Sequence, residues 1–286
     1  MDCDLTKTRS DFFLGNRTNF KMTVTASDHL ITTDGGVLFA RTWLPSDLCC
    51  DTEPTILLFH DSLGCVDHWR EFPEQLAMVT RRSVVAYDRL GFGRSGRHPG
   101  PLPLSFIRDE ALIVVPRLSE ALGLKAIIPF GHSVGGAMAI ATAARWPERC
   151  VAVVTESAQS FVESCTLAGI RAAKTDFEQP GRLQRLVRYH GKKAHWVLDA
   201  WVDTWLAPAF AGWCLDDDLR GVRCPTLALH GDQDEYGSLQ HPQRIARLTQ
   251  GFSQSVILKA CGHVPHRDQP IPVLREVTQF LVSLVT

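Results

Sequence analysis

The sequence lacks any apolar run of the roughly 18 residues that a membrane-spanning helix needs. Met1 to Lys21 is broken by charged side chains and has no continuous apolar stretch, so we expect no secretory signal. A dominant charge is also missing, because 30 Lys and Arg face 31 Asp and Glu, a formal net charge of −1. Nucleic-acid-binding proteins usually carry a broad basic surface. These absences predict a cytoplasmic protein with a small-molecule substrate, no nucleic-acid partner and no membrane span.

Metal-ligand spacing is absent as well. The nine cysteines are scattered, and the adjacent pair Cys49 and Cys50 cannot form a usual zinc knuckle. An odd number of scattered thiols is typical of a reducing, cytoplasmic setting. The histidines outside the motifs described below show no ligand spacing either. We therefore expect neither a metal nor another cofactor.

The apolar segments that are present predict an α/β fold. A chain of 286 residues with 45% apolar residues can bury the core of one large domain. A hairpin is predicted over His29–Pro45, and short apolar runs predict buried parallel strands. These runs are Thr55–Phe59, Ser83–Tyr87, Ala126–Phe130, Val151–Val154, Pro225–Leu229 and Ser255–Leu258. Segments with helical periodicity lie between or after them: Trp69–Val79, Ser105–Leu122 (which contains Pro116), Gly135–Trp146 and Ile271–Val285. Strands alternating with helices predict right-handed parallel βαβ units.

One segment interrupts this alternation. Residues 157–221 are helical in period and hold four of the seven tryptophans, and parallel α/β sheets bind ligands at the carboxyl ends of their strands. We predict a core over residues 29–156 and 222–286, a helical cap over 157–221 and a separate N-terminal segment over 1–28. In the cap, Trp201 and Trp205 share one helical face. That face packs on the core, roofs a pocket, or does both.

A short glycine-rich motif predicts a reactive serine. Gly131-His132-Ser133-Val134-Gly135-Gly136 stands between a predicted strand and a predicted helix. A turn this tight strains the backbone of Ser133 and leaves no room for a side chain at the flanking glycines. The Ser133 hydroxyl would then lie at the N-terminus of a helix, whose dipole favours developing negative charge.

This motif resembles the nucleophile elbow of the α/β-hydrolase superfamily, and the resemblance extends from about His29 to Leu284. It includes Phe59–Gly64, and it includes Asp88–Ser95, which is similar to the family's Asp-x-x-Gly-x-Gly-x-Ser loop. The resemblance implies a mostly parallel eight-stranded sheet with helices on both faces and a helical cap. It also implies that Ser133 is the nucleophile.

The family order of nucleophile, acid and base locates the two partners of Ser133. His263 follows Gly262 after the last predicted strand and matches the family's base; His266 is the alternative. Asp234 lies in Gly231-Asp232-Gln233-Asp234 after the preceding strand and matches the acid, which would orient His263. Glu156, at the end of an earlier strand, is the alternative acid, since some members carry the acid there.

The resemblance also implies an oxyanion hole. Its donors would be the N–H of Val134 and the N–H of Ser62, with the Ser62 hydroxyl as a further contributor. The family loop usually begins His-Gly, whereas this chain has Asp61 in the second position. We expect Asp61 to cap its own loop and to face away from the site. The residues predicted to bind substrate are Leu63, Glu156, Trp201 and Trp205.

These residues predict hydrolysis of a small carboxylic ester through an acyl-enzyme intermediate. The same residues serve C–C bond (vinylogous diketone) hydrolases, thioesterases, acyltransferases and cofactor-free haloperoxidases on this scaffold, so those reactions stay open. A ligand-binding receptor that retains the three residues is the alternative of another class. Branches with an aspartate nucleophile, the epoxide hydrolases and haloalkane dehalogenases, are disfavoured by Ser133. The oligomeric state is undetermined, with a homodimer among the options.

Overall fold

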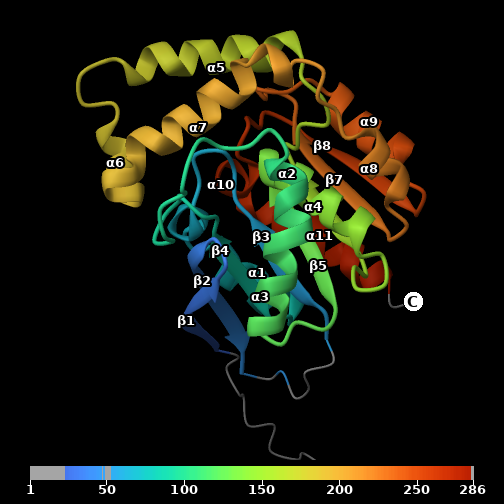
Figure 1. The fold of residues 1–286 in the computed structure, drawn as a ribbon. Coiled ribbons are helices and arrows are strands. Elements are labelled where there is room, and N and C mark those ends of the chain that lie inside the picture. Colours follow the sequence, from blue (N-terminus) through green and yellow to red (C-terminus); the bar gives the residue numbers. More distant parts are fainter. Residues whose placement is uncertain (1–22, 47, 49–52, 285–286) are drawn as a thin grey trace, which may run out of the picture.

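A computed structural model describes residues 23–46, 48 and 53–284. Its strands are β1 (Val24–Thr33), β2 (Gly36–Pro45), β3 (Thr55–Phe59), β4 (Val84–Asp88), β5 (Ile127–His132), β6 (Val153–Glu156), β7 (Thr226–Gly231) and β8 (Ser253–Leu258). They form one sheet in the order β1-β2-β4-β3-β5-β6-β7-β8 (Figure 1). β2 is antiparallel to β1 and β4, and every other neighbouring pair is parallel. This confirms the mostly parallel eight-stranded sheet.

The central strands are buried on both faces, which explains their continuous apolar sequence. Along β3, Leu57 and Phe59 join the apolar cluster on one face of the sheet, and Ile56 and Leu58 join the cluster on the other. All five residues of β3 are buried. Each of the six predicted strand segments overlaps one of β3 to β8, so short apolar runs were sufficient to locate these strands.

Helices cover both faces of this sheet. The core helices are α1 (Phe72–Thr80), α2 (Phe106–Asp109), α3 (Val115–Ala121), α4 (Val134–Arg145), α9 (Gln240–Leu248), α10 (Pro265–Asp268) and α11 (Pro270–Ser283), and a 3-10 turn, η1 (Val66–Trp69), precedes α1. Apolar residues of α1 and α11 pack on one face. Those of α2, α3 and α4 pack on the other face.

The predicted helix over 105–122 is not continuous. A π-helical turn, η2 (Glu110–Val114), separates α2 from α3. Pro116 has no N–H to donate to the carbonyl of Leu112, and its ring would clash there in a regular α-helix. The disturbance expected at Pro116 therefore appears as the wider π-helical turn η2, which ends two residues before the proline.

The first strand begins earlier than predicted. β1 starts at Val24, and its first residues pair with the end of β2, as in the register Asp28↔Arg41. The Arg41 guanidinium also binds the Asp28 carboxylate, at 2.5 Å between Nε and Oδ1. The boundary expected at residue 28 was thus wrong for residues 24–28. The rest of that segment (residues 1–22), the Cys49–Cys50 pair and residues 285–286 lie outside the described residues.

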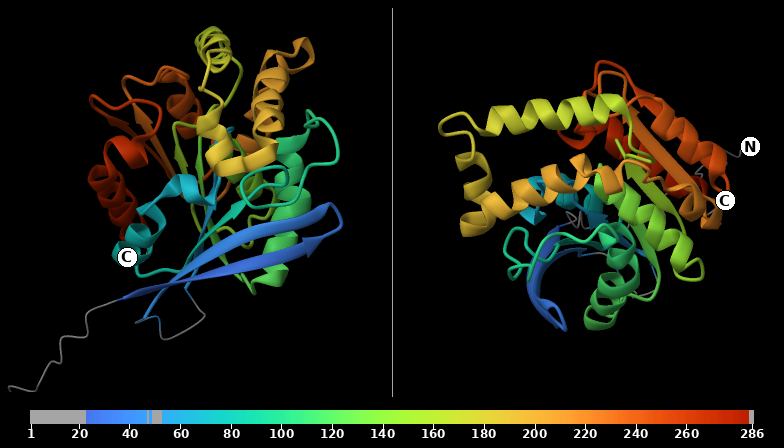
Figure 2. Two further views of the ribbon diagram at one scale, coloured as in Figure 1. Left: turned by 90° about the vertical axis from the view of Figure 1, so that its left-hand side faces the viewer. Right: turned by 45° about the horizontal axis from the view of Figure 1, so that its top comes forward.

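The insertion between β6 and β7 divides into two parts. It contains α5 (Ser164–Phe177), α6 (Gln184–His190), η3 (Gly191–Lys193), α7 (Ala194–Leu206), η4 (Pro208–Phe210) and α8 (Asp216–Gly221). α5 and α7 lie side by side beyond the carboxyl ends of the strands, and α6 connects them (Figures 1 and 2). We call α5, α6 and α7 the cap helices. α8 instead packs on α4, with Leu219 inside the core cluster.

In the part of the chain that the structure describes, no helix combines the length and apolar character needed to cross a bilayer.

Candidate active site

The turn between β5 and α4 holds Ser133 in a strained conformation. Its φ of 57° and ψ of −125° are rare for a residue with a side chain. Glycine is required on both sides, because a Cβ on Gly131 would lie 2.0 Å from the Gly135 carbonyl oxygen. A Cβ on Gly135 would lie 2.1 Å from the carbonyl oxygen of Phe59 on the neighbouring strand. Tight packing on β3 therefore presents the Ser133 hydroxyl at the N-terminus of α4.

The structure brings Ser133, His263 and Asp234 together. His263 Nε2 lies 3.0 Å from Ser133 Oγ. On the other side of the ring, Nδ1 lies 2.8 and 2.9 Å from the two carboxylate oxygens of Asp234. With the Nδ1–H donated to Asp234, the Nε2 lone pair faces the hydroxyl and can accept its proton. Chain segments more than 100 residues apart thus meet in the arrangement that a serine nucleophile requires.

Asp234 is held as a carboxylate. Its side chain has no exposed surface, and its Oδ1 accepts the backbone N–H groups of Tyr236 and Gly237. Burial alone would raise the pKa of Asp234, but the hydrogen bond and charge of His263 outweigh burial and lower it. An anion in this position can stabilise a positive charge on His263 when that ring gains a proton.

The alternative acid and base pair with each other instead. Glu156 is fully buried, and its carboxylate accepts the ring Nδ1–H of His266 at 2.8 Å and also the His266 backbone N–H. The prediction that Glu156 lines the substrate pocket was wrong, because both its oxygens face His266 inside the core. Burial would raise the pKa of Glu156, but the charge and hydrogen bond of His266 lower it.

The predicted oxyanion residues lie beside Ser133. Ser62 lines the same cavity as Ser133, and Val134 is the first residue of α4. The neighbouring N–H of Leu63 donates to Asp61 Oδ1 at 2.9 Å, so that group is already occupied. Asp61 caps its loop as expected. It does not face away, however, because its side chain is 24% exposed and forms part of the cavity wall.

A cavity of about 150 Å³ lies over Ser133. Its lining is Asp61, Ser62, Leu63, Ser133, Gln159, Thr166, Ile170, Trp201, Trp205, Tyr236 and His263. The cap helices α5 and α7 contribute Ile170, Trp201 and Trp205, so the cap supplies an apolar roof. Trp205 also packs against Phe210 with ring centroids 5.4 Å apart, which makes it part of the apolar core as well. Both interpretations of the tryptophan face therefore hold.

Sequence reasoning missed Gln159. Its Oε1 accepts a hydrogen bond from the Ser133 hydroxyl at 3.1 Å, and the side chain is buried in the cavity wall. Gln159 comes three residues after β6, where no motif marks it, and only the packing of β6 beside β5 brings it to Ser133. The Ser133 proton thus has two acceptors within reach, His263 and Gln159.

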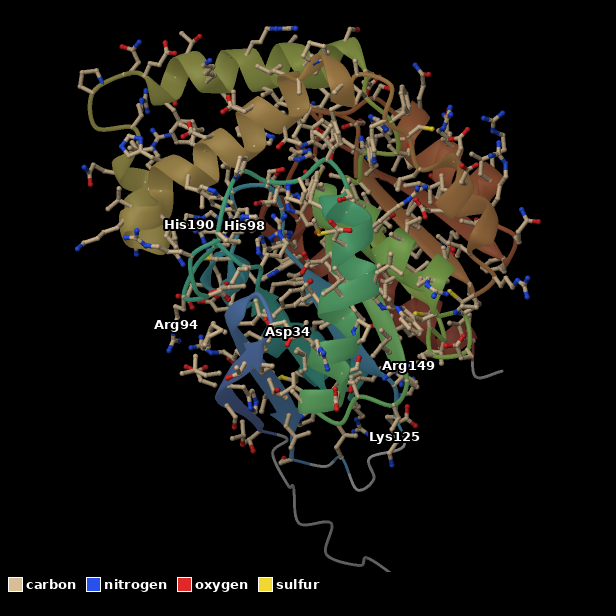
Figure 3. All side chains as sticks on the ribbon, in the orientation of Figure 1. Asp34, Arg94, His98, Lys125, Arg149 and His190 are labelled. Carbon is tan, nitrogen blue, oxygen red and sulfur yellow. The ribbon has the colours of Figure 1, made fainter. Side chains whose placement is uncertain are left out.

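The cap helices are fastened to the loop that carries Ser62. His190, labelled in Figure 3, lies at the end of α6, where the cap meets the core. Its Nδ1 accepts the Gly93 N–H at 2.9 Å, so its Nε2 carries the proton that it donates to the Leu63 carbonyl at 3.0 Å. The Lys193 ammonium donates to the carbonyls of Phe92 and Gly93 nearby. The cap and the loop that carries Ser62 are therefore joined by a hydrogen bond between His190 and Leu63.

Within residues 23–46, 48 and 53–284, no cluster of three or more His, Cys, Asp or Glu side chains could hold a metal ion.

Comparisons with known proteins place these features in a known group. A model of the Alpha/beta hydrolase family matches residues 56–276. The chain is similar to 2-hydroxy-6-oxo-2,4-heptadienoate hydrolase of Pseudomonas putida, with 26% identity over 251 residues, 80% of this chain and 89% of that protein. It is also similar to (Lyso)-N-acylphosphatidylethanolamine lipase of Bos taurus, with 32% identity over 99 residues. That match covers 35% of this chain and only 28% of the lipase.

A solved structure shares the fold. The crystal structure of a membrane phospholipase A, a bacterial virulence factor, aligns with a TM-score of 0.72 and 22% sequence identity, over 91% of this chain and 87% of that chain. At this identity the likeness concerns the fold alone.

Proposed function

Because the chain belongs to the alpha/beta hydrolase family, we propose that it is a serine hydrolase that cleaves a small carboxylic ester through an acyl-enzyme intermediate. The observation that carries this proposal is the contact of His263 Nε2 with Ser133 Oγ at 3.0 Å, with Asp234 behind the ring at 2.8 Å. Fold alone would not support it, since this fold serves many reactions.

These contacts support the following reaction. His263 accepts the proton of Ser133 as Oγ attacks the ester carbonyl, and Asp234 stabilises the imidazolium. The N–H groups of Val134 and Ser62 receive the negative charge of the tetrahedral intermediate. His263 then returns its proton to the departing alcohol and leaves Ser133 acylated. Water, deprotonated by His263, releases the acid and regenerates the serine.

The cavity supports a small acyl group. Its volume is about 150 Å³, and Leu63, Ile170, Trp201 and Trp205 form its apolar wall. An acyl chain of a few carbons would bury its surface against these side chains, whereas the scissile carbonyl would lie against the polar group around Ser133.

C–C bond hydrolysis is the second candidate, and the similarity to the Pseudomonas putida hydrolase along 80% of the chain favours it. That protein is named for a dienoate, a substrate with a carboxylate. Here the cavity wall carries the carboxylate of Asp61, and the described lining includes no Lys or Arg. A substrate carboxylate in this cavity would have no Lys or Arg partner, which favours uncharged substrates for this chain.

The test compares turnover with labelling. Purified protein is assayed with p-nitrophenyl acetate and butyrate and with a vinylogous diketone, and a fluorophosphonate probe is followed by mass spectrometry. We expect continuous ester turnover, a probe adduct on Ser133, and loss of both in Ser133→Ala. Turnover of the diketone alone would favour the second candidate. A single acylation event without recycling would indicate a receptor, and an unlabelled Ser133 in active protein would refute the mechanism.

A further inference from the structure

His132, the residue before Ser133, is enclosed by acceptors on both sides of its ring. The side chain is 2% exposed. Its Nε2 lies 2.8 Å from the carbonyl oxygen of His263, and its Nδ1 lies 3.3 Å from Asp61 Oδ2. A carbonyl oxygen only accepts hydrogen bonds, so Nε2 must carry a proton. Because Nδ1 faces a carboxylate, this geometry favours a second proton there, which is the imidazolium form.

The surrounding charges favour that form. Burial alone would lower the pKa of His132, but the hydrogen bond and charge of Asp61 outweigh it, Glu156 adds to them, and the pKa is raised. Burial likewise acts against the Asp61 carboxylate, but His132 holds the pKa of Asp61 well below its usual range. The rings of His263 and His266 lie 5.2 and 5.0 Å away, and burial lowers the pKa of His266. Two carboxylates, Asp61 and Glu156, therefore favour the protonated ring of His132.

This ion pair joins three segments that meet at the site. Asp61 uses Oδ1 to hold the N–H of Leu63, directly after Ser62, and uses Oδ2 to hold His132. His132 in turn precedes Ser133 and holds the backbone of His263. The glycine usual for the family at position 61 has no side chain and could not form this link. The connection is therefore a property of this chain.

We infer that His132, as an imidazolium paired with Asp61, is a positioning residue that fixes the His263 loop and the Ser62 loop relative to Ser133. The inference rests on the proposed function. Neither side chain needs to touch the reacting atoms. Displacing a reactive group by about 1 Å can slow an enzyme about 100-fold, so a lost link between these loops should appear in kcat.

Four variants test the two halves of the link. His132→Gln leaves an amide donor for the His263 carbonyl and removes the ion pair. His132→Asn leaves a donor toward Asp61 only. Asp61→Asn keeps the shape of residue 61 without its charge. The fourth is the double variant His132→Gln with Asp61→Asn. Asp67→Asn and His195→Asn, at exposed positions, are matched controls.

With p-nitrophenyl butyrate we expect each single variant to lose about 10- to 100-fold in kcat, with KM changed less than about threefold. The double variant should be about as slow as the slower single, because both substitutions break one link. The controls should match the parent.

The pH profile separates this role from general packing. As pH rises, His132 loses its proton, the pair with Asp61 is lost and activity should fall on the alkaline side. Asp61→Asn has no ion pair to lose, so the alkaline fall assigned to His132 should be absent in that variant. The melting temperature of each variant is measured in parallel to check folding. If a His132 variant does not fold, Asp61→Asn alone tests whether the link between His132 and Asp61 positions the site.

Failure of the positioning role can be distinguished from failure of the proposed function. If Ser133 takes up the fluorophosphonate and the folded variants keep kcat within about threefold of the parent with an unmoved alkaline limb, the positioning role is refuted. If Ser133 in the parent protein neither reacts with the probe nor turns over esters, the proposed function fails, and the inference with it.

Discussion

Replacing Asp234 by asparagine tests the proposed chemistry most directly, because the structure predicts which hydrogen bond reverses. In the parent, Asp234 Oδ1 accepts the N–H groups of Tyr236 and Gly237 at 2.8 and 3.1 Å, and both oxygens face His263 Nδ1. Asparagine has one acceptor oxygen, and those two backbone N–H groups would donate their hydrogen bonds to it. Its NH2 group would then face His263 Nδ1, which can accept that bond only by giving up its proton.

The ring proton would move to Nε2, the atom that must accept the proton of Ser133. A wrong tautomer with intact geometry lowers kcat about 10⁴-fold in a serine protease triad, equal to about 5 kcal/mol of activation free energy. We expect a loss of that size in Asp234→Asn. KM should change little, since Asp234 does not line the cavity.

The assay is steady-state hydrolysis of p-nitrophenyl butyrate, with melting temperature as a check on folding. Asp232→Asn is the matched control: it lies two residues earlier on the same loop, and its exposed partner Lys259 is 3.4 Å away. Its kcat should stay within about twofold, as for surface ion pairs in general. The reasoning is refuted if folded Asp234→Asn retains more than about a tenth of the parent kcat, or if Glu156→Gln shows the large loss instead.

Three further predictions concern stability and specificity. Trp205 is 3% exposed in an aromatic cluster, so Trp205→Ala should lower the free energy of unfolding by about 3–5 kcal/mol in a denaturant titration; a loss below about 1 kcal/mol would contradict its place in the core. The pKa of Glu156 lies below its ordinary 4.5 in the folded protein, so its stabilising effect is present above that pH and is lost as pH falls through the lower folded value. The difference in melting temperature between the parent and Glu156→Gln should therefore become smaller as the pH is lowered. A difference that does not change with pH would contradict a stabilising role of the Glu156 carboxylate. The described residues lining the cavity include no Lys or Arg, so an aryl ester with a carboxylate on its acyl group would bury that charge without a cationic partner, and it should show kcat/KM at least about tenfold below its neutral isostere. Equal rates would refute this.

The sequence alone was sufficient for features that depend on local pattern. Strands buried on both faces are mostly apolar, which located β3 to β7. The edge strand β8 is partly exposed, and its short apolar run Ser255–Leu258 marked it. The turn at Ser133 must have glycine where a Cβ would lie about 2 Å from a backbone oxygen, so Gly131 and Gly135 marked it. The resemblance of this motif to a known family then supplied the order in which Asp234 and His263 follow.

Tertiary structure alone decided which buried polar groups pair. Glu156 is the last residue of β6 and Asp234 follows β7, and both strands end at the same edge of the sheet, so either acid could have faced His263 by sequence. In the folded chain, Glu156 binds His266, and Gln159 accepts the hydrogen bond of the Ser133 hydroxyl. The Asp61 carboxylate lies beside the His132 ring. These partners lie 26 to 110 residues apart along the chain. No local sequence pattern predicts these pairings. A buried polar group needs a hydrogen-bond partner, and the packing of separate loops determines which partner lies within reach.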